Sequence, residues 1–348
     1  MNKIFKLVIL LILSSCSLNP NSTLWTKNKK IEYENSSNII EIDPKKNVLT
    51  KEINSNIKIK IGNATKKNTN YYKMTNNNGA TNYDGKLKKI SKYNYSKIEY
   101  FNQYEPEISL YDNNLIFFDN KGTILNFKEN SRLQWKKNYY SKSERNNNPV
   151  LFFSNNKNIL IVADTLAKYY SIDLKTGDKI WSSNNTSPFN SQIKILDDKF
   201  FIVDDSNILN CFSIKNGEKL WSYKTEKTLI KSQKKISIII QENKVIFINT
   251  LGDVTALDTL TGRLLWQLPT QSKTIYEEAM FLKISDMVLV NNSIFFSNNM
   301  NEFFSLDAST GILNWKQVVN SSLRPTVVND LIFTVSEEGF LIIIDSKS

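Results

Sequence analysis

Short apolar runs separated by polar turns recur along the last two thirds of this 348-residue chain. Residues 237–240, 244–248, 254–258 and 263–266 are runs of four or five residues rich in Ile, Val and Leu. Runs of this length between turn residues are typical of strands. Because short turns join antiparallel neighbours, this stretch predicts one four-stranded antiparallel sheet.

The same pattern returns at a nearly constant spacing. Residues 171–181, 211–221, 256–266 and 305–315 align without gaps, and each segment ends in Trp. A degenerate copy ends at Trp135, and successive tryptophans of the series lie 46, 40, 45 and 49 residues apart. This period predicts one four-stranded blade per repeat, and blades that stack around an axis.

A turn motif, Asp-x-x-Thr-Gly, lies inside most copies, with its Gly four residues before the Trp. Asp and Thr side chains bond nearby backbone N–H groups, and Gly accepts a positive φ. The second full copy departs from the motif, with Ser213 and Asn216 in place of Asp and Thr. Each copy opens on a small residue that leaves room for a large ring. We therefore interpret each Trp as a packing wedge between blades. Truncating such a Trp to Ala is expected to lower the free energy of unfolding by about 3–5 kcal/mol. The predicted structural residues are Trp135, Asp173, Gly177, Trp181, Gly217, Trp221, Asp258, Gly262, Trp266, Asp307, Gly311 and Trp315.

The repeats predict an all-β fold, a β-propeller of four-stranded antiparallel blades. Five complete blades are visible, and a partial sixth begins at Leu323 with runs at 323–330, 331–339 and 340–348. Two interpretations stay open. The chain is a truncated eight-bladed ring, or a six-bladed ring closes when a strand from about 88–102 supplies the missing outer strand of the last blade. Closure matters because an open sheet edge promotes aggregation.

The first 15 residues have the pattern of an export signal. Lys3 and Lys6 precede an apolar run at 7–13, which is too short to span a bilayer. The segment Leu13-Ser14-Ser15-Cys16 resembles the lipobox of bacterial lipoproteins, which implies lipidation of Cys16. Several acyl chains together give stable anchoring. With Cys16 lipidated, Cys211 has no partner for an intramolecular disulfide.

Charge is unevenly distributed in this chain of net charge +11. Residues 17–105 hold 16 basic and 8 acidic side chains, whereas residues 106–348 hold 27 basic and 26 acidic ones. A nucleic-acid-binding protein needs its basic residues on the folded binding face, so the nearly neutral repeat region argues against that class. We divide the chain into a signal peptide (1–15), a lipid-anchored polar Lys/Asn-rich tether (16–85) and a propeller (86–348).

The repeated Ala/Ser-x-Asp-x-x-Thr-Gly-x-x-x-Trp pattern resembles the tryptophan-docking repeat of the PQQ-type β-propeller family. Combined with a lipobox, it is most similar to the BamB family of lipoproteins of the outer-membrane β-barrel assembly machinery. The resemblance implies a non-catalytic scaffold anchored at the periplasmic face of the outer membrane of a Gram-negative bacterium. It also implies a partner, the periplasmic POTRA domains of a BamA-like protein, and a role in inserting outer-membrane barrels. The long insert after Trp266 suggests Tyr276 and Met280 as candidate partner-binding residues.

Two alternatives remain. One is a general envelope propeller that binds another protein or a cell-wall component, because propellers host many functions. The other is a PQQ-dependent dehydrogenase, whose relatives often carry adjacent cysteines. This chain has no His and only two, widely separated, cysteines, which excludes Ser-His-Asp triads and His-ligated metal sites. The pairs Asp197-Asp198 and Asp204-Asp205 fit solvated hairpin turns. We expect no catalytic residue, cofactor, metal or small-molecule substrate.

Overall fold

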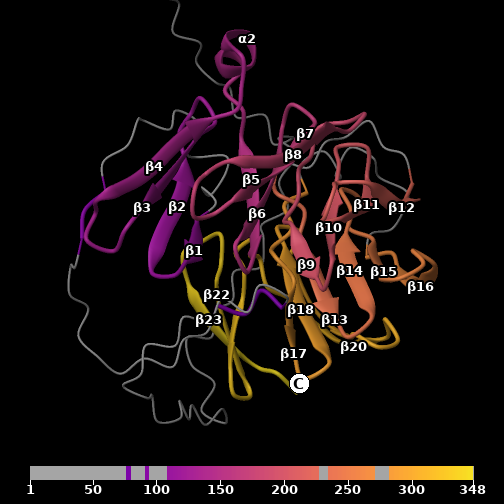
Figure 1. Ribbon diagram of the computed structural model, residues 1–348. Helices are drawn as coiled ribbons and strands as arrows, with labels where there is room; N and C mark the ends of the chain where they lie inside the picture. The colour runs from indigo at the N-terminus through magenta and orange to yellow at the C-terminus, as the bar shows by residue number, and fades with distance from the viewer. Residues whose placement is uncertain (1–75, 80–90, 94–107, 227–233, 271–281, 348) are drawn as a thin grey trace, which may run out of the picture. The chain divides into compact units, whose positions relative to one another are not determined.

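The described part of the chain contains six β-sheets (Figure 1). The computed structural model describes residues 76–79, 91–93, 108–226, 234–270 and 282–347, all within one compact unit, Ile57–Ser348. Five of these sheets have four strands and one has three, and strand pairing within each sheet is antiparallel. The predicted all-β propeller class is therefore confirmed. One short helix, α2 (Lys142–Asn146), also lies in these ranges.

Each sheet is a meander in which sequence neighbours pair, and we number the sheets blades 1 to 6 in chain order. Blade 1 consists of β1 (Ser109–Tyr111), β2 (Asn114–Phe118), β3 (Thr123–Phe127) and β4 (Leu133–Asn138). Blade 2 consists of β5 (Leu151–Asn156), β6 (Ile159–Asp164), β7 (Lys168–Asp173) and β8 (Lys179–Asn184). Blade 3 consists of β9 (Lys194–Leu196), β10 (Lys199–Val203), β11 (Ile208–Ser213) and β12 (Lys219–Lys224).

The remaining three sheets repeat this plan. Blade 4 consists of β13 (Ile238–Gln241), β14 (Lys244–Ile248), β15 (Val254–Asp258) and β16 (Leu264–Leu268). Blade 5 consists of β17 (Val288–Val290), β18 (Ser293–Asn298), β19 (Glu302–Asp307) and β20 (Leu313–Gln317). Blade 6 has β21 (Thr326–Val328), β22 (Leu331–Val335) and β23 (Leu341–Asp345). The strands predicted for blade 4 agree with the observed ones to within two residues.

The core lies between neighbouring blades, and blade 3 shows a sheet that is covered on both faces. In β10, Phe200 and Ile202 pack into the cluster shared with blade 2, whereas Phe201 and Val203 pack into the cluster shared with blade 4. Successive side chains of β10 thus point to opposite faces of the sheet, and both faces are buried. For this reason the sequence of the strand is continuously apolar from Phe200 to Val203. The first strands β1, β5, β9 and β13 contact one another in succession, so the first strand of each of these blades is innermost.

Each of the five repeat tryptophans docks on the next blade. The indole N–H of Trp135 donates to the carbonyl of Leu174 in blade 2 at 3.0 Å, and that of Trp181 donates to the carbonyl of Ile214 in blade 3 at 2.8 Å. Trp221 and Trp315 repeat this bond with Thr259 and Ser346. The indole faces lie over the turn glycines of the following blades, which are Gly177, Gly217, Gly262 and Gly311.

The docking glycine serves two purposes at once. Gly217 has a φ of +75°, which an L side chain rarely adopts, and a Cβ placed there would lie 2.6 Å from Cζ3 of Trp181. Sequence reasoning assigned these glycines to the turn alone. The structure shows that they are also the floor on which the preceding indole rests, so Gly and Trp of neighbouring repeats form one contact.

The wedge also depends on a small residue across the strand pair, as the repeat suggested. Trp221 pairs with Cys211 on β11, and the register shifts directly after this pair. The same shift occurs in the other four-stranded blades, where the Trp pairs with Ser171, Ala256 and Ser305 in blades 2, 4 and 5 and with the larger Asn126 in blade 1. A bulge of this kind leaves one extra residue on the outer strand, here the residue before the Trp. Cys211 itself is fully buried, and burial raises the pKa of its thiol to about 12.

At blade 1 a tyrosine takes the place of the docking Trp. The Tyr93 hydroxyl donates to the carbonyl of Glu129 at 3.4 Å, and its ring packs edge-on against Phe127 at 5.5 Å. Glu129 holds in blade 1 the position that Leu174 holds in blade 2. This placement favours a preceding blade that includes the chain around Tyr93. Most of 88–102 lies outside the described residues, so the choice between six closed blades and a truncated eight stays a prediction.

We expect Gly217→Ala to lower the free energy of unfolding by about 2–4 kcal/mol, from left-handed backbone strain and from overpacking against Trp181. Gly339→Ala is the matched control, because Gly339 also has a positive φ (+91°) but nothing lies within 4 Å of its added Cβ. That control should lose only about 1 kcal/mol. Urea unfolding of both variants measures the difference, and equal losses would contradict the docking account.

The Cys211 thiol should be inert in the folded protein. In a Cys16→Ser variant, where Cys211 is the only remaining cysteine, alkylation at pH 8.5 should be at least about a thousandfold slower than for a free thiol, because so little thiolate forms. Full reactivity should return in denaturant. Rapid labelling of the native variant would show that the blade 3 wedge is open.

Candidate interaction surface

A second set of turn residues, between the second and third strands of each blade, is buried and polar. Asp204 is 1% exposed, and its Oδ1 accepts the backbone N–H groups of Ser206 and Ile208. Its Oδ2 accepts the side-chain amides of Asn185 and Asn210. Our expectation of a solvated Asp204 is therefore wrong, whereas Asp197 and Asp198 are exposed in their hairpin turn.

This carboxylate position recurs from blade to blade. Asp119, Asp164 and Asn249 each accept the N–H groups two and four residues later, as Asp204 does. The turn leaves those N–H groups without a strand partner, and a buried side-chain oxygen satisfies them. The sequence signal was present as an Asp or Asn after each second strand. In each of these residues one side-chain oxygen accepts both turn N–H groups, so the position holds the fold.

A buried group of titratable side chains lies between blades 1 and 2. The Tyr140 hydroxyl donates to Asp164 and lies 3.4 Å from that of Tyr170. Burial raises the pKa of Tyr140 far above its usual value, with smaller contributions from Tyr170 and Asp164. Burial also raises the pKa of Asp164, against the lowering effect of the Tyr140 bond. Tyr170 and Asp164 are fully buried, so this cluster is part of the packing between blades 1 and 2.

The motif acids sit at the opposite, outer turns. Asp173 accepts the N–H groups of Lys175 and Thr176 at 2.8 and 3.0 Å. Asp258 accepts both the N–H and the hydroxyl of Thr261, which holds the pKa of Asp258 below its usual value. Asp307 makes the same two bonds with Thr310. Within the described residues, no group of three or more acidic or cysteine side chains could hold a metal ion.

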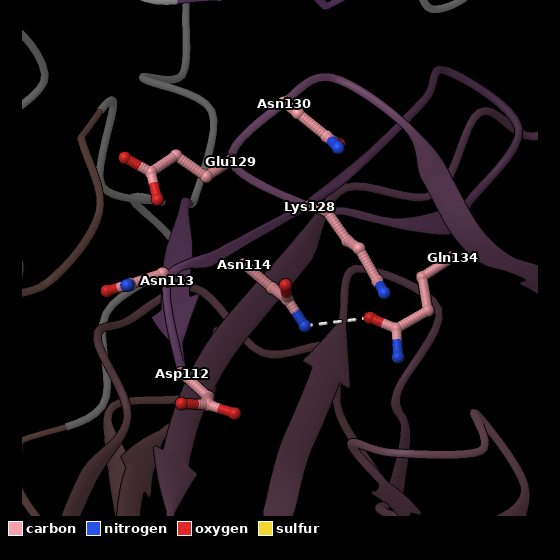
Figure 2. A pocket seen from close by; sticks show the side chains of 7 residues that line it. All are labelled: Asp112, Asn113, Asn114, Lys128, Glu129, Asn130 and Gln134. Carbon is pink, nitrogen blue, oxygen red and sulfur yellow. Dashed lines mark hydrogen bonds between the residues drawn. The ribbon is translucent and has the colours of Figure 1, made fainter.

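The surface hollow at the corner of blade 1 is polar. It has a volume of about 610 Å³ and lies between the β1–β2 and β3–β4 turns. Figure 2 shows Asn114, Lys128 and Gln134 pointing toward one another, with a hydrogen bond of 2.8 Å from Asn114 to Gln134, while Asn113 and Glu129 point away. Cofactor sites are enclosed and mostly apolar. This hollow has neither property, and we assign it no ligand.

Exposed apolar side chains gather on the outer strands instead. Leu264 and Leu265 on β16 are both about half exposed, and Leu260 in the preceding turn is more exposed still. In blade 5, Ile312 and Leu313 are exposed at the corresponding turn and strand. At the positions of Leu260 and Leu264, blades 2 and 3 carry lysine instead, as Lys175, Lys179, Lys215 and Lys219. The position of Leu265 is apolar in all three blades, since Ile180 and Leu220 there are also about half exposed.

The outer strand of blade 4, β16, also differs from the other outer strands in the charge along its free edge. It is the last strand of its sheet, and its sequence Leu-Leu-Trp-Gln-Leu has no charge. Each of the other outer strands of the complete blades contains lysine, on β4, β8, β12 and β20. Edge lysines prevent the addition of further strands. Thus, among the complete blades, β16 is the edge without that protection.

Three predicted site residues, Cys16, Tyr276 and Met280, lie outside the described residues. The tryptophans, glycines and Asp residues of the repeat motif lie at the blade junctions and outer turns, where they hold the fold. Sequence reasoning did not single out β16, although the signal was readable as a missing lysine in one of five aligned outer strands.

Comparison with known proteins identifies the repeat region. A protein-family model described as outer membrane protein assembly factor BamB matches residues 120–348. Comparison with curated proteins finds no match. The crystal structure of BamB from Moraxella catarrhalis is similar, with a TM-score of 0.60 and 17% identity over 69% of this chain and 72% of that one.

Two further structures share the fold. The computationally designed Ika8 protein matches with a TM-score of 0.55 and 12% identity, over 68% of this chain and 70% of that one. A quinohemoprotein alcohol dehydrogenase from Pseudomonas putida matches with a TM-score of 0.51 and 13% identity, over 61% of this chain and 41% of that one. At these identities the structures show the architecture alone. The family match covers about two thirds of the sequence, and the chain belongs to the family of the outer membrane protein assembly factor BamB.

Proposed function

We propose that this protein is a non-catalytic scaffold that binds the periplasmic domains of a BamA-like protein and assists assembly of outer-membrane β-barrels. The family supports this role. The buried acids in the turns between second and third strands, and the tyrosines around Asp164, form hydrogen bonds within the fold. This supports a binding role over catalysis. The quinohemoprotein dehydrogenase has the same architecture, so the architecture by itself does not distinguish the two classes.

The proposal includes a lipid anchor. Residues 1–15 act as the signal peptide, Cys16 carries the lipid, and the polar tether connects it to the propeller at the periplasmic face of the outer membrane. In the described residues, no helix has the length and apolar character needed to cross a membrane.

The unprotected edge of β16 carries the proposal for the binding surface. The backbone groups on its outer side have no strand partner among the described residues, since β16 ends the sheet order of blade 4. An extended partner segment can add to such an edge through main-chain bonds, while apolar side chains supply contact area. Leu264 and Leu265 offer that area beside the edge. Tyr276 and Met280 follow β16 in the sequence and remain candidates for the same surface.

The matched variants are Leu264→Lys and Leu133→Lys. Both leucines hold the same register position on an outer strand, opposite Leu257 and Phe127, and they are 46% and 44% exposed. Lysine is the native residue at this position in blades 2 and 3, as Lys179 and Lys219, so both variants should fold. Leu264→Lys should weaken binding to the BamA-like protein of the same bacterium at least tenfold, which is about 1.4 kcal/mol. Leu133→Lys should bind normally.

Titration of the purified periplasmic domains of the BamA-like protein onto each variant measures these affinities. If the wild-type protein does not bind them, the assembly role fails, and the chain is a propeller with another envelope partner. If the wild type binds and both variants bind equally well, the role stands and the β16 surface is wrong.

A further inference from the structure

Four residues from the predicted tether are bound inside the propeller. Asn76–Gly79 fall within the range 16–85, yet the first three of them bond to blades 3, 4, 5 and 6. For these four residues the structure differs from the tether interpretation. A polar Asn-rich sequence has no apolar pattern that would signal burial, so this contact could not be read from the sequence.

The side chain of Asn77 is at the centre of the contact. This residue is 7% exposed, and its φ of +60° is one that Asn tolerates. Its Nδ2 faces four acceptors, at 3.0 Å from Gln192 Oε1, 3.2 Å from Ser237 Oγ, 3.2 Å from the Ile238 carbonyl and 2.9 Å from the Met287 carbonyl. Its Oδ1 accepts a hydrogen bond from Nζ of the buried Lys194.

The neighbouring residues bond to strand edges. The carbonyl of Asn76 accepts the N–H of Leu289 on β17 at 2.9 Å. The side-chain amide of Asn78 exchanges two bonds with the backbone of Val327 on β21, at 3.0 and 3.2 Å. These groups lie on the first strands of blades 5 and 6, and those strands pair with one neighbour each inside their sheets. The segment therefore satisfies backbone groups that the sheets leave open.

The arrangement selects a carboxamide. Acceptors surround the nitrogen and an ammonium group faces the oxygen, so both ends of the amide are satisfied in one orientation. A carboxylate in this place would set an oxygen against two carbonyls, a serine hydroxyl and Gln192. All these groups belong to the first strands of blades 3 to 5 or to the residues directly before them, which places the site on the inner side of the sheets.

We propose that the inner side of blades 3 to 6 is a carboxamide-binding site for an extended Asn-containing peptide, and that Asn76–Gly79 occupy it in cis as an internal ligand. This inference stands apart from the proposed scaffold role, because it uses neither β16 nor any partner. It predicts that the site, once vacated, accepts the same peptide in trans.

The test uses the full chain with Asn77→Ala and a labelled synthetic peptide of residues 72–82. Fluorescence anisotropy should show binding to Asn77→Ala and at least tenfold weaker binding to the wild type, whose site is filled. The peptide with Asp in place of Asn77 should not bind the variant. In hydrogen exchange, the amides of Leu289 and Val327 should exchange at least tenfold faster in Asn77→Ala than in the wild type.

Asn113→Ala is the matched control, since Asn113 is also an asparagine with a positive φ, +61°, but lies exposed in the β1–β2 turn of blade 1. It should behave as the wild type in both measurements. Equal exchange at Leu289 and Val327 in wild type and Asn77→Ala, or no peptide binding by the folded variant, overturns the proposal. If Asn77→Ala does not fold, recovery on refolding with the Asn peptide but not the Asp peptide supports it, and no recovery overturns it.

Discussion

The docking of an indole on a glycine turn of the next blade is the contact on which the rest of the structure depends. Each four-stranded sheet here has two apolar faces and cannot be stable alone, so it needs a neighbour at a fixed distance and angle. At Trp135, Trp181 and Trp221 the indole provides both, because its face rests on a glycine and its N–H donates to a backbone carbonyl beside it. Trp266 keeps the glycine contact, but its N–H has no partner among the described residues. Trp181 on Gly217 shows both parts of the contact.

With the blades held in this way, polar groups have distinct roles by position. The buried acids such as Asp204 satisfy the turns between the second and third strands, and the exposed acids such as Asp258 satisfy the outer turns. Both sets hold turns of the fold. What is left for recognition is the outer edge of the sheets, where β16 has lost the usual lysine, and the inner side, where Asn77 is bound. Both of these surfaces expose strand edges or backbone groups that suit an extended chain segment.

The sequence predicted the parts of the fold that repeat locally. Trp spacing located the blades, and the apolar runs located strands such as β13 to β16 nearly to the residue. The sequence did not reveal that Gly217 supports Trp181. The turn alone accounts for a glycine at this position, and the contact with the indole joins two different repeats. Sequence reasoning misjudged Asp204, since burial of a turn depends on the neighbouring sheet. It could not place Asn77, whose partners lie 115 to 210 residues away along the chain and share no pattern with it.

A double-mutant cycle at the junction of blades 3 and 4 tests the docking contact most directly. Trp221 rests on Gly262, where an added Cβ would lie 2.7 Å from the indole Cδ2. Gly262→Ala should cost about 2–4 kcal/mol in the wild-type background, but only about 1 kcal/mol of backbone strain in a Trp221→Ala background, where the indole is gone. That difference is the coupling the account predicts. Equal costs in both backgrounds would show that glycine and indole do not support each other.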